Sequence, residues 1–412
     1  MALGSSVTQS QPLDCGEQAA RTGIALPSVC IVGITAGVTQ MLTGERPTGV
    51  GLRSDEIGVG GAERQVGTLG RLLRAQGWPV RFVVGDWGQT SDHTPDGIPL
   101  IVGYRYGAGL KGLRFLYPQA PMLWRALAEA RADIYLARGV TAWSGLTALF
   151  CRRHRKRFVQ ALASGMDVDP AHTYAGPRDR WLHRQALRRA DVVVAQHQEQ
   201  ADLLRQHYGR EAQVIGNVVP QPTGPVTVAA GATPMVLWVA NLKPLKRPEV
   251  VVEVARAIPE ARFVMVGGPD PDHGGDQIAA WLREQMAAVP HLEYAGRLPP
   301  QQVLEYYRQA WVLLQTSRPG IEGFPNALLE AWTYGVPTVS SSRAGGIIER
   351  EGLGAYCETV PEMIAAVRHY LQASVPDRQR FAEHARRYMM EYHSPERVVG
   401  AYADLLAALG SA

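Results

Sequence analysis

Residues 322–332 read Glu-Gly-Phe-Pro-Asn-Ala-Leu-Leu-Glu-Ala-Trp, and the architecture can be worked out from this segment and its surroundings. Just upstream, residues 311–314 form a short apolar run typical of a buried strand, and Ser-Arg-Pro-Gly at residues 317–320 interrupts it. Pro325 suits the first position of a helix, because the N–H that it lacks would have no partner there, and strong helix formers follow. The sequence therefore predicts a strand, a loop and a helix that begins beside Gly323.

This predicted helix start has the chemistry of a ligand site. The first N–H groups of a helix are unpaired and carry a partial positive charge, and Gly323 lets the oxygen atoms of a ligand approach the backbone. Glu322 lies in the loop and Glu330 in the second turn, so both carboxylates can accept hydrogen bonds from the vicinal hydroxyls of a sugar or ribose. Together these groups indicate a sugar nucleotide. The alternative is that Glu322 stabilises the helix dipole and Glu330 is a solvated glutamate.

Length and composition indicate a globular protein with two cores. With 412 residues the chain is long for a single hydrophobic core. Hydrophobic residues make up 46% and charged residues 19%, which is typical of ordinary soluble domains. The formal net charge of +4 is small for this length, so the overall charge gives no reason to expect nucleic acid as a partner.

Apolar runs alternate with amphipathic segments along the chain, and this alternation predicts an α/β protein with two doubly wound parallel sheets. The first half contains expected strands at residues 29–32, 80–84, 134–137, 158–162, 192–195 and 214–215. The second half contains expected strands at residues 235–239, 262–266, 292–295, 311–314 and 338–340. We therefore expect two Rossmann-like domains, each with helices on both faces of its sheet.

Breaks in these patterns predict the domain boundaries. Residues 1–26 lack a continuous apolar core, so we expect a flexible tail there and neither a signal peptide nor a membrane span. An N-terminal domain at 27–222 is expected to be followed by a Pro-, Gly- and Thr-rich linker at 223–234 and a C-terminal domain at 235–385. Residues 386–412 complete a final helical region. The four cysteines are widely spaced, which predicts a reducing, cytoplasmic compartment and no zinc site or disulfide framework.

A second glycine-rich segment, Gly-Val-Gly-Gly-Ala-Glu at residues 58–63, precedes an amphipathic helix. Gly60 and Gly61 permit positive φ and close backbone approach, so this loop is a candidate for contacting a phosphate or an acceptor. A tight turn closing onto the helix explains the same residues, and the loop alone does not decide between the two interpretations.

Cations follow the strand expected at residues 235–239. Lys243, Lys246 and Arg247 lie just before a helix onset at Pro248, and open α/β sheets bind ligands at the carboxyl ends of their strands. A diphosphate leaving group needs positive charge beside it, so Lys246 is the first candidate for that role. The alternative is a solvated loop.

With these motifs the chain resembles the retaining glycosyltransferases of family 4, glycosyl transferases group 1, which have the GT-B fold. Glu322 and Glu330 match the family's pair of glutamates separated by seven residues. The resemblance implies that Glu322 contacts hydroxyls of the donor sugar and that Glu330 holds the nucleotide ribose. Gly323, Phe324 and Pro325 would then hold the sugar and phosphates. It also implies two domains facing a deep interdomain cleft, with the last helix crossing back to the N-terminal domain.

The resemblance extends to other positions. The loop with Gly60 and Gly61 corresponds to the family's Gly-Gly-x-Glu loop, which faces the donor across the cleft. Lys246 corresponds to the family's phosphate-binding lysine, and Arg297 lies at a strand end where the nucleotide base is usually bound. The implied donor is a nucleotide-diphosphate sugar, with UDP expected ahead of GDP, and neither a cofactor nor a metal is required.

Two departures from the family pattern limit the resemblance. Asn241 stands where the family has an arginine, so one of the two usual phosphate-neutralising cations is missing, and Lys243 or Arg247 could replace it. No histidine follows the strand at 158–162, where many members have one, so the sequence provides no general base. Asp167 and Ser164 in that loop are either contacts to the acceptor or ordinary surface-loop residues.

The expected reaction is transfer of a sugar, as in the hexosyltransferases, from the nucleotide sugar to an acceptor hydroxyl with retention of configuration. No motif specifies the acceptor, which is expected to be a lipid-linked glycan or a small molecule. Basic clusters at residues 152–157 and 178–189 are either solvated faces or peripheral contacts to the inner face of a membrane. A sugar-nucleotide epimerase and a non-catalytic sugar-nucleotide-binding protein are the alternatives, whereas the glycine spacing at residues 33–37 argues against a nicotinamide dehydrogenase.

Overall fold

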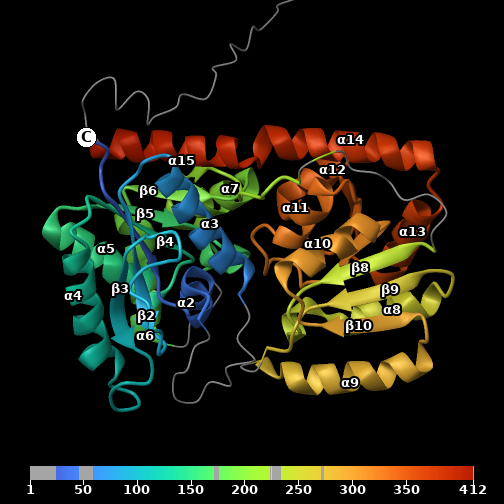
Figure 1. The fold of residues 1–412 in the computed structure, drawn as a ribbon, viewed down its shortest axis with the longest axis horizontal. Helices are drawn as coiled ribbons and strands as arrows, with labels where there is room; N and C mark the ends of the chain where they lie inside the picture. The colour runs from blue at the N-terminus through green and yellow to red at the C-terminus, as the bar shows by residue number, and fades with distance from the viewer. Residues whose placement is uncertain are drawn as a thin grey trace, which may run out of the picture.

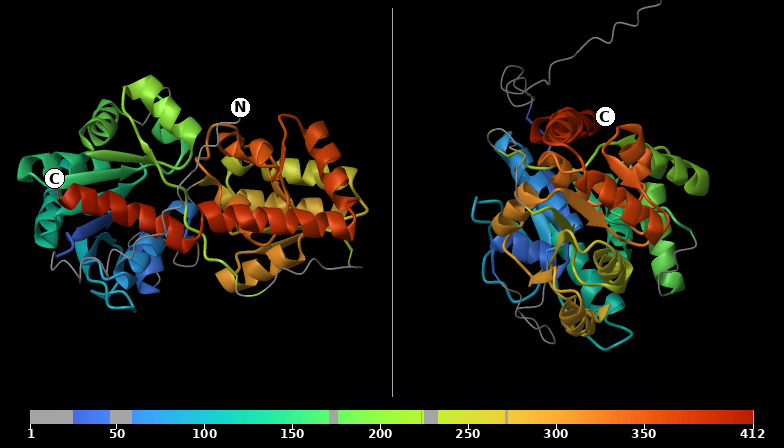
Figure 2. Two further views of the ribbon diagram at one scale, coloured as in Figure 1. Left: turned by 90° about the horizontal axis from the view of Figure 1, so that it is seen from above. Right: turned by 90° about the vertical axis from the view of Figure 1, so that its right-hand side faces the viewer.

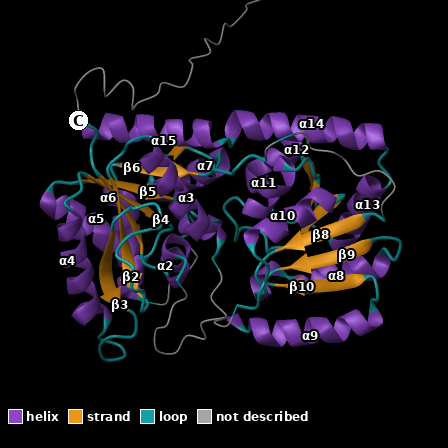
Figure 3. Ribbon diagram, viewed as in Figure 1, coloured by secondary structure: helices purple, strands orange, loops and turns teal. Residues whose placement is uncertain are grey.

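The computed structural model describes residues 25–45, 59–170, 176–222, 224, 233–270 and 273–411. Most of the predicted tail and linker, namely residues 1–24, 223 and 225–232, lies outside the described residues, as do Cys15 and Gly58. Within the described ranges the chain forms two α/β units side by side, each built on a parallel sheet (Figure 1). Figure 3 separates the helices from the strands by colour.

The N-terminal sheet has seven parallel strands in the order β3-β2-β1-β4-β5-β6-β7. The strands are β1 (Val29–Gly33), β2 (Val80–Asp86), β3 (Leu100–Arg105), β4 (Ile134–Arg138), β5 (Arg157–Ala161), β6 (Val192–Ala195) and β7 (Gln213–Val214). The sequence expectation lacks β3, because Val102 on this edge strand is 48% exposed and Gly103 interrupts the apolar run. The central strands are covered on both faces, which explains why they read as continuous apolar runs.

The C-terminal sheet has six parallel strands in the order β10-β9-β8-β11-β12-β13. The strands are β8 (Met235–Val239), β9 (Arg262–Val266), β10 (Leu292–Gly296), β11 (Val312–Gln315), β12 (Thr338–Ser340) and β13 (Gly354–Tyr356). Only β13, a three-residue edge strand, is missing from the strands expected in this half. Two parallel Rossmann-like sheets are therefore confirmed.

Helices cover both faces of each sheet. The N-terminal unit contains α2 (Ala36–Thr43), α3 (Gly61–Ala75), α4 (Ala120–Ala130), α5 (Ala142–His154), α6 (Pro177–Arg189) and α7 (Gln198–Tyr208). The C-terminal unit contains α8 (Pro248–Ala257), α9 (Gly275–Ala288), α10 (Pro300–Gln309), α11 (Asn326–Thr333), α12 (Ile347–Arg350) and α13 (Val360–Leu371). Short helical turns lie at Phe115–Gln119, Gly165–Asp167, Pro244–Lys246 and Ala344–Gly346.

The last two helices connect the units. In α14 (Val375–Tyr392), Met389 belongs to the core of the C-terminal unit, whereas in α15 (Pro395–Gly410) Tyr402 belongs to the core of the N-terminal unit. The helices run end to end across both units in Figure 2, and they meet at Ser394, which caps α15. The final helical region thus returns to the N-terminal unit, as the GT-B fold requires. None of the helices in the described part of the chain is long and apolar enough to cross a membrane.

Candidate functional site

The loop between β11 and α11, residues 316–325, follows the carboxyl end of a central strand and is held by buried polar contacts. The Thr316 hydroxyl donates a hydrogen bond of 2.6 Å to the Lys246 carbonyl and accepts one of 3.0 Å from the Trp238 indole. The Ser341 hydroxyl donates to the Ser317 carbonyl at 2.6 Å. Helix α11 begins at Asn326, one residue after Pro325, which has a helix-compatible φ of −59°. The loop and the first turn of α11 therefore have a fixed position relative to the sheet.

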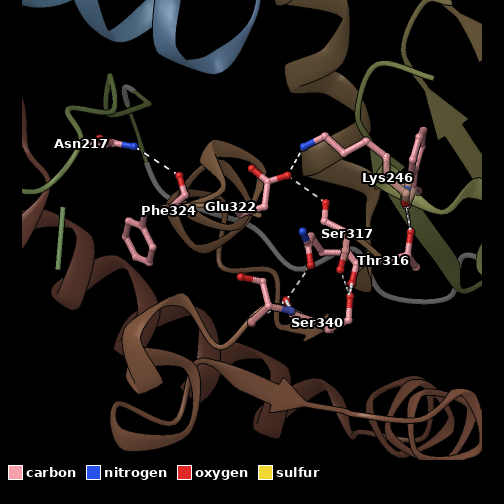
Figure 4. A network of polar contacts seen from close by, with 11 residues as sticks. Asn217, Lys246, Thr316, Ser317, Glu322, Phe324 and Ser340 are labelled. Carbon is pink, nitrogen blue, oxygen red and sulfur yellow. Dashed lines mark hydrogen bonds and ion pairs between the residues drawn. The ribbon is translucent and has the colours of Figure 1, made fainter. Parts of the chain in front are cut away.

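Glu322 lies in this loop and forms an ion pair with Lys246, which ends the turn after β8 (Figure 4). The Ser317 hydroxyl donates a 2.9 Å hydrogen bond to the same carboxylate oxygen. Burial alone would raise the pKa of Glu322, but the charge and hydrogen bond of Lys246 outweigh it, and the pKa lies below its ordinary value. The two side chains remain 18% and 26% exposed, so the pair is accessible to a ligand.

Glu330 lies in α11, and the structure pairs it with a residue of the other unit. Arg64 of α3 places its guanidinium 3.1 Å from the Glu330 carboxylate. Burial raises the pKa of Glu330 even though Arg64 lowers it, and the buried hydroxyl of Tyr307 lies close by. Arg64 could not be singled out from the sequence, because an arginine on an amphipathic helix ordinarily belongs to its solvated face.

The glycine-rich loop at the start of α3 faces the start of α11. Gly60 is the N-cap of α3 with a φ of −79°, so the conformation there does not require glycine. A Cβ atom on Gly61, in contrast, would lie only 2.6 Å from the Asn326 side-chain nitrogen. Close approach between the two units therefore explains glycine at position 61.

Asn217, which follows β7, lies at the centre of a polar network between the units. Its side-chain oxygen accepts hydrogen bonds from Arg138 at 2.6 Å and Gln196 at 3.0 Å. Its side-chain nitrogen donates to the Asn326 oxygen at 2.9 Å and to the Phe324 carbonyl at 3.3 Å, the latter shown in Figure 4. This amide bridges strand ends of the N-terminal unit and the start of α11.

His197 provides a further contact between the units that the sequence analysis did not identify. This N-cap of α7 donates from Nε2 to the Gly323 carbonyl at 3.0 Å, and its Nδ1 accepts from the Gln200 amide at 3.3 Å. Burial lowers its pKa, so the imidazole is neutral with its proton on Nε2. Many family members have a histidine after the strand that corresponds to β5, whereas His197 follows the neighbouring strand β6.

The loop after β5 also contacts the β11–α11 loop, close to Glu322. Ser164 forms an isolated bridge with Glu322, and the Gly165 amide donates to the Ile321 carbonyl at 3.2 Å. Asp167 is turned into this loop, where its two oxygens accept from three backbone amides, including that of Ala163 at 2.7 Å. Burial raises the pKa of Asp167. Asp167 therefore organises the loop and is itself buried, whereas Ser164 is only partly buried.

The remaining candidates lie at the carboxyl ends of β8 to β10. Lys243 pairs with Asp270 at 2.8 Å, and Arg297 donates to the Pro269 carbonyl at 3.1 Å, so these two side chains share one loop region. Arg247 is 3.8 Å from Glu249 on its own helix. Asn241 lies two residues after the end of β8 and is half-buried. Of these cations, only Lys246 is paired with Glu322 in the structure.

Over the described ranges, no group of three or more acidic, histidine or cysteine side chains could hold a metal ion. The groups assembled around the β11–α11 loop are carboxylates, amines, guanidinium groups and amides. Such a set binds hydroxyls and phosphates through hydrogen bonds and charge.

Comparison with known proteins assigns this architecture to a family. The family model described as Glycosyltransferase Family 4 matches residues 59–220, and the model described as Glycosyl transferases group 1 matches residues 233–373. The chain belongs to this family of glycosyltransferases, whose members transfer a sugar from a nucleotide sugar and retain its configuration.

Individual relatives and solved structures have low sequence identity to this chain. The D-inositol 3-phosphate glycosyltransferase of Acidothermus cellulolyticus is 25% identical over 277 residues, which cover 60% of this chain and 59% of that protein. The structure of Anabaena HepE in complex with UDP and glucose has a TM-score of 0.69 at 18% identity and covers 93% of this chain and 100% of its own. Sucrose-phosphate synthase from Thermosynechococcus elongatus has a TM-score of 0.71 at 19% identity, with coverage of 93% and 99%. These structural similarities establish the GT-B fold.

Proposed function

We propose that this protein transfers a hexosyl group from a nucleotide-diphosphate sugar to an acceptor hydroxyl with retention of configuration. The observation that carries the proposal is the Lys246–Glu322 pair beside the start of α11, with Glu330 in the same helix. One cation, two carboxylates and the free amides of a helix start match the charges and hydroxyls of such a donor.

In the proposed mechanism, the donor replaces contacts that the site residues now make with one another. Lys246 and the first amides of α11 bind the diphosphate, and Glu322 accepts hydrogen bonds from hydroxyls of the sugar. Glu330 binds the ribose hydroxyls. The phosphates can take over the contact of Lys246, and the hydroxyls of the donor can donate to both carboxylates. Arg64, which is 41% exposed, can be solvated when Glu330 binds the ribose.

The reaction forms a bond between the acceptor oxygen and the anomeric carbon and breaks the bond from that carbon to the phosphate oxygen. The acceptor proton passes to the departing diphosphate, so the products are the glycoside and a nucleoside diphosphate. Lys246 stabilises the negative charge that develops on the leaving group, and this positioned cation supplies the main catalytic effect.

UDP is the proposed nucleotide, ahead of GDP, because the similar HepE structure is described with UDP and glucose. For the acceptor we propose a lipid-linked glycan or a small molecule. The name of the Acidothermus relative, a D-inositol 3-phosphate glycosyltransferase, adds a phosphorylated polyol to the compounds worth testing. A cytoplasmic location stays a prediction from the cysteine pattern.

The first experiment measures thermal stabilisation by UDP, GDP, ADP and their common sugar conjugates, in the wild type and in Glu330→Ala. A ligand that binds only the native state raises the melting temperature. We expect one nucleotide series to stabilise the wild type and to lose that effect in Glu330→Ala. Glu349→Ala is the matched control, because Glu349 is an exposed glutamate that pairs with Arg343 at 3.7 Å.

Turnover is tested next with the nucleotide sugar that stabilises the protein. Release of nucleoside diphosphate together with an α-to-α or β-to-β transfer product, read by NMR, is the expected result. Conversion of the donor without an acceptor would indicate an epimerase, and stabilisation without turnover against a broad acceptor panel would indicate a non-catalytic binding protein; either result would refute the proposed activity.

A further inference from the structure

Exposed apolar side chains are concentrated in one segment of the N-terminal unit. Among the described residues, twelve large hydrophobic side chains are exposed, and seven of them lie at residues 102–122. The most exposed are Leu110 at 75%, Tyr117 at 74%, Leu116 at 64% and Leu113 at 59%. Single exposed leucines are common on protein surfaces, but four such side chains within eight residues form a patch that needs a partner.

The backbone of this segment is ordered into turns. The Leu113 amide donates to the Leu110 carbonyl at 3.0 Å, and the Leu116 amide donates to the Leu113 carbonyl at 2.9 Å. Between the leucines, Phe115 is buried, and its ring lies 4.7 Å from that of Trp143. One aromatic side chain thus anchors the segment to the core while the leucines point outward.

The same segment is positively charged. Residues 97–128 contain no aspartate or glutamate, and they contain Arg105, Lys111, Arg114 and Arg125. Helix α6 adds Arg178, whose guanidinium lies 4.0 Å from the Phe115 ring centre and pairs with Asp179 at 2.7 Å. One turn further along α6, Trp181 is 51% exposed. Leucines, a tyrosine and a tryptophan interspersed with cations are the composition of surfaces that enter the headgroup region of a bilayer.

The position of the segment relates it to the candidate site. It follows the carboxyl end of β3, and parallel strands place all their carboxyl ends at one edge of the sheet. The loop with Ser164, which contacts Glu322, follows β5 at that same edge. In Figure 1 the connection between β3 and α4 protrudes at the foot of the N-terminal unit.

We propose that residues 106–122, together with Arg178 and Trp181, dock the protein on an anionic lipid surface. Leu110, Leu113 and Leu116 enter the interface, and Lys111 and Arg114 contact lipid phosphates. A second copy of the chain is a poorer occupant of this patch, because residues 97–128 carry cations and no acidic residue, and two copies of this segment repel each other. The proposal rests on this patch alone and holds whatever sugar the protein transfers.

Cations at residues 152–157 and 188–189, from the two basic clusters singled out in the sequence, line a different surface from that of Arg178 and Trp181. The ends of α5 and α6 meet around a cavity of about 530 Å³ that is lined by Arg152, Arg155 and Arg188, among others. This cavity lies where β5 and β6 begin, which is the opposite edge of the sheet, and its lining includes no exposed leucine or aromatic side chain. Apolar insertion can therefore be separated from general electrostatic attraction by changing the two surfaces independently.

The test is co-sedimentation with vesicles of phosphatidylcholine alone and of phosphatidylcholine mixed with phosphatidylglycerol. We expect the wild type to bind the mixed vesicles and to bind pure phosphatidylcholine much more weakly. The triple variant Leu110→Ser, Leu113→Ser, Leu116→Ser should bind the mixed vesicles about tenfold or more weakly, because binding scales with the apolar area inserted. The control variant Arg152→Gln, Arg155→Gln, Arg188→Gln should retain most of the binding.

Thermal stability and the nucleotide-induced shift provide the check on folding. Both should be unchanged in the triple leucine variant, because the substituted side chains are exposed and lie outside the donor site. Failure of the wild type to bind mixed vesicles would overturn the proposal, as would equal binding by the leucine variant. Conversion of a wild-type dimer to a monomer by the leucine substitutions, without vesicle binding, would instead assign the patch to self-association.

Discussion

The two sides of the β11–α11 loop are held by different chemistry. On one side, Glu322 pairs with the cation Lys246. On the other, the Phe324 carbonyl accepts from the Asn217 amide and the Gly323 carbonyl accepts from the neutral imidazole of His197. Charged groups of the first side are partly exposed and can exchange one partner for another, whereas the buried amide and imidazole groups have defined geometry. We infer that the first side serves the ligand and the second side holds the two units together.

The largest effect is expected at the centre of the buried side, from Asn217→Ala. The substitution removes the oxygen that accepts from Arg138 and Gln196, so a buried guanidinium loses a partner. We expect the free energy of unfolding to fall by about 3 to 4 kcal/mol in urea titrations. Asn217→Asp keeps that oxygen but places a second acceptor against the Asn326 oxygen and the Phe324 carbonyl, so it should also lose stability. A loss below about 1 kcal/mol in Asn217→Ala would show that the network contributes little to folding.

The next effect concerns His393, which lies where α14 meets α15 and donates from Nδ1 to the Asn217 carbonyl at 2.9 Å. Burial lowers its pKa to about 4 from 6.5. His393 binds a proton more readily in the unfolded chain than in the folded protein. The free energy of unfolding is therefore unaffected by this histidine above about pH 6.5, and it falls as the pH drops towards 4, by about 3 kcal/mol in total.

His393→Asn should flatten the stability curve over this range of pH, because asparagine can donate the same hydrogen bond without titrating. The measurement is the urea midpoint of the wild type and the variant between pH 4 and pH 7. If both proteins lose stability in parallel, another group is responsible for the pH dependence.

On the charged side, Lys246→Ala should lower kcat/KM about 100-fold or more, which corresponds to about 2.7 kcal/mol of transition-state stabilisation. The substitution also leaves the partly buried Glu322 without its cation, so the melting temperature must be measured in parallel. Lys156→Ala is the matched control, since Lys156 pairs with Asp133 at the far edge of the N-terminal sheet. If Lys156→Ala loses as much activity as Lys246→Ala, the loss is not specific to Lys246 and its proposed role at the leaving group is contradicted.

The smallest effect on stability is expected from Glu330→Gln, less than about 1 kcal/mol. Burial raises the pKa of Glu330, so the ionised carboxylate has little net benefit for folding, and Arg64 is 41% exposed and can be solvated instead. Nucleotide affinity should nevertheless fall about tenfold, as measured by calorimetry. A large drop in melting temperature with unchanged affinity would make Glu330 a structural residue of the interface between the units.

Much of the fold could be predicted because its signals are local. The expected strands at 192–195, 235–239, 262–266 and 338–340 coincide with β6, β8, β9 and β12, since strands buried on both faces read as continuous apolar runs. The edge strands β3 and β13 were not predicted, because they are short or half-exposed and their composition resembles that of loops.

The candidate site was predictable in part, for the same reason. Glu322 and Glu330 could be singled out because a loop and a helix start place them at fixed offsets, and Lys246 because it follows a strand end. His197 carried no such signal, because a histidine at a helix start usually has only a capping role.

The sequence by itself determined the alternation of strands and helices, the two units and the loop-to-helix segment with its two glutamates. The tertiary structure decided what surrounds that segment: Arg64 beside Glu330, His197 on Gly323, and Asn217 between the units. The physical reason is the separation along the sequence of the residues that interact. A strand or helix start depends on neighbours a few residues away, whereas Arg64 and Glu330 are 266 positions apart and meet only because α15 and the packed loops bring the two units together.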